Sequence, residues 1–433
     1  MQDKPVVALI SLGCDKNLVE SERMLFAIGG ACVFCAEPEG ADLIVINTCG
    51  FIRDATEEAR EHIADALALK AGGCCRAVIV TGCAANRYSD ELSADFPNID
   101  KILTDTADLP AAIADIFNID IPRQEGRILA TPGHYAYLKI AEGCDNACAY
   151  CAIPMIKGPY KSQPMDTLLA EAEALAAGGV KELIIVAQDT AVYGADLYGE
   201  VRLVPLLRAL SGIDAIRWIR LMYCYPEHIG DDLINEMSTN PKICKYLDMP
   251  IQHSGGDVLA RMGRRMDEDA LRALIARLRA AMPDIALRTT VMTGFPGETK
   301  AEFQGLLTFL DDMRFDRLGA FAYSREEGTA AYDMPDQLPE RTKAARRDRL
   351  MTRQRDISEH NLRRFAGRRM SVLVEAWDGA FYVGRSEMDC PDMDGVVYIR
   401  ANENALQIGD FADVIITDTH DYDLSAKPAG ENE

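Results

Sequence analysis

Three features that would each narrow the class of this 433-residue protein are missing from its sequence. No stretch approaches the ~18 consecutive apolar residues of a membrane-spanning helix, so we expect no membrane association. The first residues do not follow the basic-then-apolar layout of a secretory signal peptide, which favours a cytoplasmic location. The six histidines show neither H-x₃-H nor H-E-x-x-H spacing, which argues against a histidine-ligated metal site.

Positive charge is also scarce. The chain has 46 basic and 68 acidic residues, a formal net charge of −22. Proteins bind the phosphate backbone of nucleic acids through lysine and arginine, so a chain this acidic is a poor general nucleic-acid binder. A cationic protein is the partner that this charge favours. The alternative is that the acidity only keeps the protein in solution.

Cysteine, by contrast, is plentiful. The odd total of thirteen, without an export signal, favours reduced thiols and metal binding over a disulfide framework. Cys144, Cys148 and Cys151 form a C-x₃-C-x₂-C run directly after a strand-like segment at 135–141. A closed zinc or iron–sulfur site has four protein ligands, and no cysteine or histidine follows within the next dozen residues. The run is therefore typical of a reactive cluster with one open iron. The alternative is a zinc site with a distant fourth ligand.

Strands and helices alternate through residues 5–117. Apolar strand candidates lie at 5–12, 42–47, 77–81 and 99–103, with helix candidates at 16–28 and 54–69. Continuous apolar strands that alternate with helices predict an open parallel sheet covered on both faces.

The first three of these strands are each followed by a cysteine: Cys14, Cys49 and Cys83. Open parallel sheets bind ligands at the carboxyl ends of their strands, so we expect these three thiols to converge. A glycine beside each cysteine should leave room for a bulky group to approach the backbone. The pattern favours a second three-thiolate site. The alternative is three buried cysteines that fall there by coincidence.

Beyond a polar linker at 118–134, the alternation resumes on a larger scale. Strand candidates at 135–141, 181–187, 216–221, 246–249, 285–292 and 317–322 predict a partial (β/α)6 barrel. A charged helix at 341–364 leads to short strands typical of a small antiparallel β-barrel, and we expect the tail at 426–433 to be disordered. The chain is therefore expected to be an α/β protein with domains at 1–120, 130–366 and 367–430.

With these residues in hand, the chain resembles the radical S-adenosylmethionine (radical SAM) methylthiotransferase family over nearly its full length. The motifs that carry the resemblance lie at residues 11–22, 47–52, 135–144, 188–190, 294–299, 323–329 and 422–424. The resemblance implies an amino-terminal methylthiotransferase domain, a radical SAM barrel and a carboxy-terminal TRAM domain. Lys157 and Gln163 depart from the family pattern, which usually has arginine there, so the contacts of those arginines are in doubt here.

The resemblance also implies cofactors and their ligands. One [4Fe-4S] cluster would generate a radical from SAM, and a second would handle the sulfur supplied by an external sulfur donor. An external electron donor would reduce them. The implied cluster ligands are the two cysteine triads, Cys144, Cys148 and Cys151 in the barrel and Cys14, Cys49 and Cys83 in the first domain. The implied SAM contacts are Gln188, Gly294 and Glu298.

Within the family, the chain is most similar to enzymes that methylthiolate the β-carbon of an aspartate in the small-subunit ribosomal protein uS12. That carbon–hydrogen bond is too weakly acidic for a side-chain base, so radical chemistry supplied by a cofactor fits the task. A basic ribosomal protein would complement the last domain, since residues 368–433 hold five basic and fourteen acidic residues, a net charge of −9. We expect acids such as Asp389, Asp392 and Asp394 to contribute to this docking.

Aromatic side chains in the same domain are candidate anchors for that partner, namely Trp377, Phe381 and Tyr382. The main rival is a tRNA adenosine methylthiotransferase, which shares all three domains. An RNA-binding module should be basic, which disfavours the rival. A two-cluster electron carrier or scaffold is also disfavoured, because such proteins are usually small and cap every iron with cysteine. We expect the other seven cysteines to be buried or incidental thiols.

Overall fold

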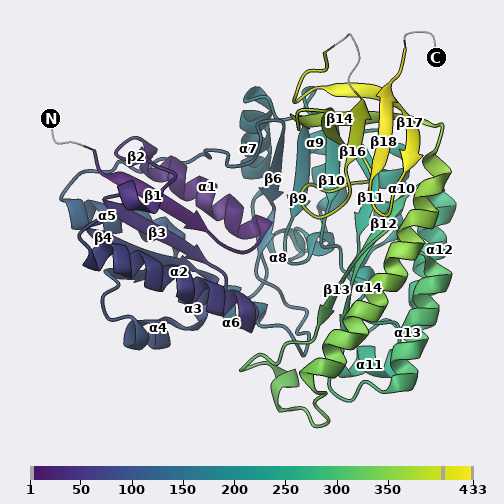
Figure 1. Ribbon diagram of the computed structural model, residues 1–433, viewed down its shortest axis with the longest axis horizontal. Coiled ribbons are helices and arrows are strands. Elements are labelled where there is room, and N and C mark those ends of the chain that lie inside the picture. The colour runs from purple at the N-terminus through teal and green to yellow at the C-terminus, as the bar shows by residue number, and fades with distance from the viewer. Residues whose placement is uncertain (1–3, 401–404, 431–433) are drawn as a thin grey trace.

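The computed structural model describes residues 4–400 and 405–430, which form three main β-sheets in succession along the chain (Figure 1). The N-terminal sheet has the strand order β2-β1-β3-β4-β5, and its four pairings are parallel among the described residues. Its strands are β1 (Val6–Ser11), β2 (Val33–Phe34), β3 (Leu43–Thr48), β4 (Ala77–Gly82) and β5 (Lys101–Leu103). Its helices are α1 (Asp15–Gly29), α2 (Arg53–Ala71), α3 (Cys83–Arg87), α4 (Ser89–Asp95) and α5 (Leu109–Phe117).

Burial explains why this sheet is parallel and covered on both faces. Every residue of β3 and β4 is buried, and their side chains alternate between two separate apolar clusters. One cluster packs under α2, and the other packs under α1 and α5. The predicted open sheet is confirmed. The two-residue edge strand β2 was not predicted, because it is too short to show a pattern.

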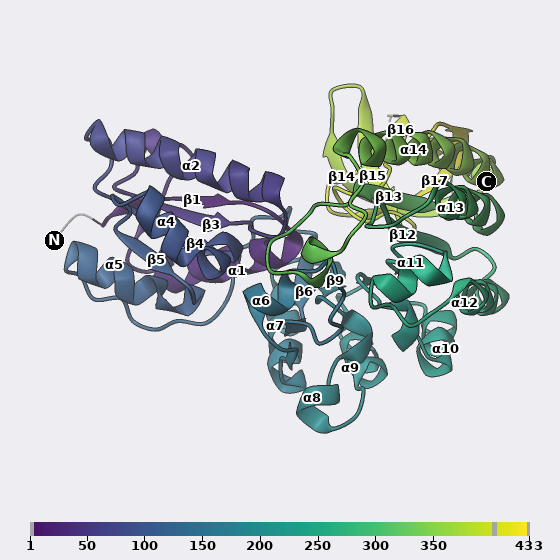
Figure 2. The same cartoon turned by 90° about the horizontal axis from the view of Figure 1, so that it is seen from below.

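The central sheet contains six parallel strands in the order β13-β12-β11-β10-β9-β6. They are β6 (Tyr135–Lys139), β9 (Glu182–Val186), β10 (Trp218–Leu221), β11 (Ile243–Asp248), β12 (Ala286–Thr293) and β13 (Arg317–Ala322). The longer helices are α7 (Met165–Ala177), α9 (Leu203–Ser211), α10 (Asp231–Thr239), α12 (Glu268–Ala281), α13 (Lys300–Met313) and α14 (Glu340–Leu362). The order matches the predicted partial (β/α)6 barrel. Figure 2 shows α7, α9, α10 and α12 on the side of this sheet away from the C-terminal barrel, and α14 beside the barrel.

Shorter elements line the loop that carries the second cysteine triad. A two-stranded antiparallel ribbon joins β7 (Ala141–Glu142) to β8 (Lys161–Ser162), and α6 (Ile153–Lys157) lies between them in sequence. The remaining short helices are α8 (Ala195–Tyr198) and α11 (Gly256–Arg261). None of the helices in the described part of the chain is both long and apolar enough to cross a membrane.

The C-terminal sheet closes on itself as a five-stranded barrel in the order β14-β15-β16-β18-β17. Its strands are β14 (Arg369–Trp377), β15 (Phe381–Ser386), β16 (Val397–Arg400), β17 (Phe411–Thr419) and β18 (Leu424–Pro428). Four of the five pairings are antiparallel, and β16–β18 is parallel. The expected disorder of the tail is wrong for 426–428, which belong to β18, while 431–433 lie outside the described residues.

The C-terminal barrel packs on one face of the central sheet. Alternate strand residues such as Ile184 and Tyr246 share an apolar cluster with Val372 and Val397 of the barrel. The other face of the central sheet, including Leu183 and Ile185, packs against the helices instead. The central sheet is therefore buried on both sides, and the barrel supplies one of its two covers.

A buried charge network joins these two sheets. Glu182 of β9 accepts from Arg220 Nε at 2.7 Å and from Arg385 Nη2 at 2.6 Å, and all three side chains are at most 2% exposed. Burial alone would raise the pKa of Glu182, but the two arginines outweigh burial and lower its pKa. Arg385 of β15 also binds Glu375 of β14 at 2.7 Å, which extends the network into the barrel.

We predict that Glu182→Gln destabilises the fold by about 3–5 kcal/mol, because it leaves the buried Arg220 without a carboxylate and Arg385 with Glu375 alone. The pKa of Glu182 is depressed, so its stabilisation is complete at neutral pH and is lost only as pH falls through the lowered value. Denaturant unfolding followed by the fluorescence of Trp218 and Trp377 measures the effect. The exposed pair Arg53–Glu57 gives the control variant Glu57→Gln, for which we expect no measurable change. Equal stability of the two variants would contradict this role of Glu182.

Candidate functional site

The first cysteine triad lies where three strands of the N-terminal sheet end. Cys14 caps the start of α1 three residues after β1, Cys49 directly follows β3, and Cys83 begins α3 directly after β4. A Cβ placed on Gly13 would meet Cys49 Sγ at 3.1 Å. A Cβ on Gly50 would meet the backbone of Ala84 at 2.6 Å. The three loops that carry these cysteines therefore pack directly against one another.

This packing corrects our explanation of the neighbouring glycines. We expected Gly13, Gly50 and Gly82 to leave space for a bulky group beside the backbone. Instead, the space beside each is filled by a neighbouring loop, and for Gly82 the nearest atoms belong to Asn47 and Thr48. Gly13 and Gly82 also have φ values of 95° and 91°, which side-chain-bearing residues rarely adopt. The glycines bring the cysteine loops together.

Polar residues from the same motifs hold the three loops in place. Asn17 Nδ2 donates to the carbonyl oxygens of Leu12 and Thr48, both at 3.0 Å. Its Oδ1 lies 3.6 Å from Cys83 Sγ. Asn47 Nδ2 in turn donates to the carbonyl oxygen of Asn17 at 2.9 Å. The asparagine of the motif at 11–22 thus links all three strand ends.

The second triad lies in the loop between β7 and α6, and that loop is bound to the ends of β9 and β10. Asn146 Nδ2, between Cys144 and Cys148, donates to Asp189 Oδ2 at 2.8 Å. Asp189 also contacts His228 Nδ1 at 2.7 Å. The His228 ring stacks on Tyr225, whose hydroxyl lies 3.4 Å from Cys148 Sγ. Side chains therefore form a closed ring from the cysteine loop through the sheet and back.

Tyr225 is held from its other side by Arg264, whose guanidinium lies 3.6 Å from the ring centroid. Arg264 itself donates to the carbonyl oxygen of Pro250 at 2.7 Å, after β11. The cysteine loop is also bound through its backbone, since Ala149 donates to the carbonyl oxygen of Met262 at 2.9 Å. Three strand ends of the central sheet thus contribute to holding the second triad.

The two triads adjoin one another. Cys83 packs against Ala152, which follows Cys151 directly, and against Ile156 of α6, and these three residues form a small buried cluster. Lys157 lies in the same place: its Nζ is 2.8 Å from Glu142 Oε1, and its positive charge acts on the Cys83 thiol. The lysine that replaces the usual arginine therefore keeps a charge at the junction of the two triads.

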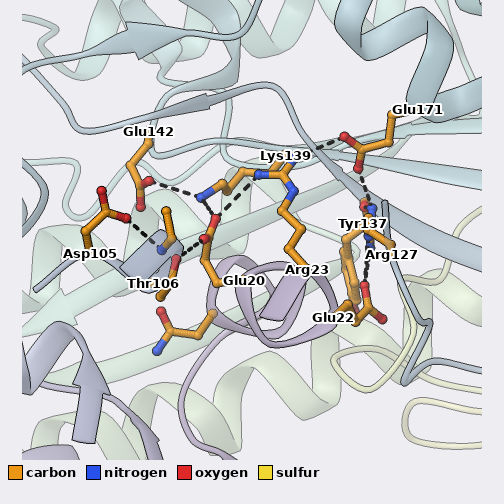
Figure 3. A network of polar contacts seen from close by, with 12 residues as sticks. Glu20, Glu22, Arg23, Asp105, Thr106, Arg127, Tyr137, Lys139, Glu142 and Glu171 are labelled. Atoms are coloured by element: carbon orange, nitrogen blue, oxygen red, sulfur yellow. Dashed lines mark hydrogen bonds and ion pairs between the residues drawn. The ribbon is translucent and has the colours of Figure 1, made fainter. Parts of the chain in front are cut away.

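Helix α1 is bound to the central sheet by a network of charged side chains (Figure 3). Glu20 of α1 binds Lys139 of β6, and Lys139 also lies 3.1 Å from Glu142. Arg23 of α1 binds Glu171 of α7 at 3.0 Å. Burial would raise the pKa of Glu20, but Lys139 and Arg23 outweigh it and lower that pKa to about 2. Since Cys14 precedes α1 and Cys144 follows β7, the network joins the elements that carry both triads.

Two more contacts strengthen this junction. Arg127, from the segment before β6, binds Glu22 of α1 and lies 2.9 Å from Glu171. Lys16 Nζ, in the first turn of α1, lies 3.3 Å from the ring centroid of Tyr223, directly after β10. Burial disfavours the charge of Lys16, but Asp15 and Tyr223 outweigh burial and raise its pKa. Charged side chains along α1 therefore contact groups of the central part of the chain.

The thiols that could hold metal differ in exposure: Cys14 is exposed, Cys83 is buried, and the other four are partly buried. Burial raises the pKa of Cys83 to about 11, that of Cys144 to about 11 and that of Cys151 to about 12. Burial also raises the pKa of Cys49, against backbone N–H groups of Phe51 and Gly50 that lower it. Such thiols are protonated at neutral pH, and a bound metal would have to displace their protons.

The described residues contain no group of three cysteine, histidine or acidic side chains that could hold a single metal ion. A four-iron core is larger than one ion, so its thiolates must surround a space and need not meet at a point. Each triad supplies three sulfur ligands and no oxygen or imidazole ligand from the chain, which is a donor set that suits iron–sulfur clusters. These triads are therefore the residues that could hold such groups.

The expected SAM contacts lie at the ends of β9 and β12. Gln188 follows β9, and its buried Oε1 has no hydrogen-bond partner among the described residues. Glu298 binds the Gly294 backbone N–H and lies 2.7 Å from Arg346 Nη1. Gly294 has a φ of 75°, and a Cβ there would meet Lys343 Cγ at 2.4 Å. Packing against α14 thus accounts for this glycine, whereas Gln188 presents an open acceptor.

The site contains two further contacts between residues that no sequence pattern connects. Glu326, inside the motif at 323–329, lies 3.0 Å from Arg87 at the end of α3. His253 Nε2 lies 3.5 Å from Glu298 Oε1 with both side chains fully buried. The two residues of each pair lie far apart in the sequence, and the residues around each one give no indication of its partner. All seven other cysteines are free, and Cys32, Cys75, Cys224, Cys244 and Cys390 are buried as expected.

Comparison with known families divides the chain into three matches. Residues 6–104 match the Uncharacterized protein family UPF0004, residues 138–310 match the Radical SAM superfamily, and residues 366–428 match the TRAM domain. The structure also resembles in fold the radical S-adenosylmethionine methyltransferase TsrM from Kitasatospora setae, with a TM-score of 0.57 at 13% identity over 76% of this chain and 77% of that chain. The fold and the superfamily match define a radical SAM enzyme.

The similar full-length proteins are more specific. The ribosomal protein uS12 methylthiotransferase RimO of Pelotomaculum thermopropionicum is 47% identical, over 97% of this chain and 98% of that protein. RimO of Lachnoclostridium phytofermentans is 45% identical, over 96% of this chain and 98% of that protein. The chain belongs to the RimO family of radical SAM methylthiotransferases.

We predict that the buried thiols of the metal-free protein react slowly with iodoacetamide at pH 7.5. A raised pKa leaves little thiolate at that pH, and the thiolate is the reacting form. The alkylation rate of Cys83 should rise roughly tenfold per pH unit as pH climbs toward about 11. Peptide mass spectrometry measures each site separately, with the exposed Cys74 as the internal reference. Equal rates for Cys83 and Cys74 at pH 7.5 would contradict this description.

Proposed function

We propose that this chain methylthiolates the β-carbon of an aspartate in the small-subunit ribosomal protein uS12, with two [4Fe-4S] clusters and SAM as its cofactors. The observation that carries the proposal is the contact between Cys83 of the first triad and Ala152, the residue that follows Cys151 of the second triad. A methylthio group must pass from a sulfur-bearing site to the carbon where a radical has formed. Adjoining triads fit that sequence of events, whereas two remote triads would not.

The cysteines have named roles in this proposal. Cys144, Cys148 and Cys151 hold the cluster next to the SAM site, and Cys14, Cys49 and Cys83 hold the cluster that handles sulfur. When bound, the barrel cluster and SAM supply a carbon radical able to remove an unactivated hydrogen. With three protein ligands each, both sites leave one position of a four-iron core open.

The chain's own residues hold the cysteine loops in place. The ring through Asn146, Asp189, His228 and Tyr225 fixes the barrel triad, and the loops around Gly13 and Gly50 enclose the other. Gln188 Oε1 is the open acceptor that suits the ammonium group of SAM. We keep Gly294 and Glu298 as further SAM contacts, because their turn directly follows β12 in the central sheet. An electron donor and a sulfur donor come from outside the chain.

The proposal also includes the domain boundaries and the cellular location of the protein. The domain boundaries would fall at 1–120, 130–366 and 367–430, in line with the three sheets. The protein would work in the cytoplasm, where ribosomal proteins are available to it. The two positions that depart from the family pattern do not obstruct the proposal. Lys157 keeps its charge at the junction. Gln163 is bound through its backbone to Ile140 and Tyr193.

The docking surface differs from the one expected from the sequence. Asp389 is 1% exposed and binds Arg317 and Ser386. Asp394 is similarly buried, 2.7 Å from the hydroxyl of Tyr246 and 3.4 Å from Arg288. These two acids stabilise the fold, and reversing their charge would destabilise it. Asp389 and Asp394 are therefore withdrawn as docking residues.

Exposed groups of the C-terminal barrel remain as candidates. Trp377 and Phe381, at the two ends of the β14–β15 turn, are 45% and 38% exposed. Tyr382 packs beside Trp377 with ring centroids 4.8 Å apart. The acids Asp392, Asp418 and Asp421 are exposed on the same barrel. A barrel that exposes both an aromatic pair and negative charge suits a basic protein better than RNA, which supports uS12 over the tRNA alternative.

The clusters give a direct prediction. Anaerobic reconstitution should load near eight irons per chain, two four-iron clusters. Replacing Cys144, Cys148 and Cys151 together by alanine should leave about half, because the other triad is built from a different sheet. Iron analysis together with the visible absorption of the cluster measures this. Loss of all the iron in that variant would show that the two triads do not bind metal independently.

Docking gives a second prediction. Asp418→Lys with Asp421→Lys should weaken binding of uS12 by about tenfold at low salt, with the difference shrinking as salt screens charges beyond ~8 Å. SAM cleavage without uS12 should not change. The matched control is Glu61→Lys with Asp65→Lys, the same charge change on exposed positions of α2. Equal weakening by both pairs would mean that total charge, and not the barrel surface, attracts uS12.

A further inference from the structure

One loop of the central sheet touches both cysteine triads. Residues 323–331 follow β13, and we call them the bridge segment. Toward one end Glu326 contacts Arg53 at the start of α2, after Cys49, and Arg87 at the end of α3, the helix that begins at Cys83. At the other end, the backbone N–H of Ala331 donates to the carbonyl oxygen of Ala149 at 2.7 Å, between Cys148 and Cys151. The bridge segment is therefore in contact with both cysteine loops at once.

The Glu326 end is held by three donors. Its Oε2 accepts from Arg87 Nη1 at 3.0 Å. Its Oε1 accepts from the backbone N–H of Arg53 at 2.8 Å and from Ser324 Oγ at 2.6 Å. The side chains of Glu326 and Arg87 are each only 5% exposed. A carboxylate this buried is costly without such donors, so the position of Glu326 is tightly determined.

Arg87 extends the contact to the loop after Cys49. Its Nη1 donates to the carbonyl oxygen of Gly50 at 3.0 Å, and its Nη2 donates to that of Glu327 at 2.9 Å. Arg87 is the last residue of α3, the helix that begins at Cys83. One guanidinium group therefore binds the Cys49 loop, the end of the Cys83 helix and the bridge segment together. The planar fork of arginine suits this, and lysine could not make all of these contacts.

The bridge segment is itself stiff. Thr329 Oγ1 donates to the carbonyl oxygen of Glu326 at 2.7 Å, which closes the turn between its two ends. Gly328 adopts a φ of 82°, and a Cβ there would meet Met155 Sδ of α6 at 2.9 Å. The turn thus packs on the helix that follows Cys151. A stiff segment bound at both ends transmits the position of one cysteine loop to the other.

We propose that Glu326 and Arg87 are positioning residues that set the separation and orientation of the two cysteine triads. The inference rests on the proposed function, since the separation matters only if a group passes between the triads. Breaking the Glu326–Arg87 contact should leave each triad able to bind its iron, because neither residue is a ligand. The contact instead couples radical formation to methylthio transfer, and its loss lets SAM be consumed without product.

The test compares Glu326→Gln with Glu327→Gln in the full chain. Glu327 is the adjacent, exposed glutamate, and only its backbone contacts Arg87, so its variant removes the same charge without the contact. Arg87→Lys is a second variant that keeps the positive charge and loses the fork. Each protein is reconstituted anaerobically and given SAM and uS12. The measurements are iron per chain, 5′-deoxyadenosine formed, methylthio groups on uS12, and amide hydrogen exchange.

In Glu326→Gln and Arg87→Lys we expect wild-type iron and 5′-deoxyadenosine within about twofold, and at least a tenfold fall in methylthio groups per 5′-deoxyadenosine. Amide exchange at residues 50–53 and 84–88 should accelerate at least tenfold, while that of β3 and β12 stays protected. Glu327→Gln should match wild type in every measurement.

Wild-type coupling in Glu326→Gln, or unchanged exchange at 50–53 and 84–88, would overturn the inference. Equal effects of Glu327→Gln would overturn it too, since charge alone would then be responsible. Accelerated exchange throughout the chain in both Glu326→Gln and Arg87→Lys would also overturn it, because the contact would then support the fold in general. Failure of the proposed function is distinguishable: the wild-type protein itself would bind no iron, cleave no SAM or leave uS12 unmodified.

Discussion

The contact between Cys83 of the N-terminal sheet and Ala152 beside Cys151 is the constraint on which the rest of the structure depends. Two sheets that fold from separate parts of the chain each present three thiols, the first at three strand ends and the second in the single loop between β7 and α6. Parallel sheets bring such side chains together locally, but nothing in either sheet sets its distance from the other. The interface between the sheets has to do that.

Ion pairs along α1 contribute most to setting the distance between the two sheets. The helix follows Cys14 directly, and Glu20 and Arg23 on its surface bind β6 and α7 of the central sheet. Lys157 and Glu142 continue the same network to the edge of the second triad. Each of these charges is largely buried, so breaking one pair leaves its partner uncompensated and costs far more than at an exposed site. The interface is therefore rigid as well as specific.

Features that depend on neighbouring residues were predicted from the sequence, whereas features that depend on residues far away in the sequence were not. Continuous apolar strands and the cysteines after them were sufficient to predict both parallel sheets, because parallel pairing puts consecutive strand ends on one edge. Strand β18 was missed because Lys427 and Pro428 resemble a polar tail, and its pairing with β16 and β17 overrides that local pattern. Asp389 looked like a surface acid because its arginine partner lies 72 residues away in sequence.

The glycines and the bridge segment show the same limit at the site. A glycine beside a cysteine suggested space for a ligand, whereas neighbouring loops fill that space, and only the three-dimensional packing distinguishes the two. The Glu326–Arg87 contact spans 239 residues, and no spacing rule connects such positions. A sequence pattern can thus propose ligand residues, but it gives no indication of the residues that set the distance between two sites.

The most direct test of the account is anaerobic incubation with SAM, uS12 and a reductant, with the mass of uS12 as the readout. The wild-type protein should replace one hydrogen of uS12 with a methylthio group. A variant without Cys14, Cys49 and Cys83 should still form 5′-deoxyadenosine and leave uS12 unmodified. Normal methylthiolation by that variant, or transfer by the wild-type protein to tRNA and not to uS12, would contradict the account.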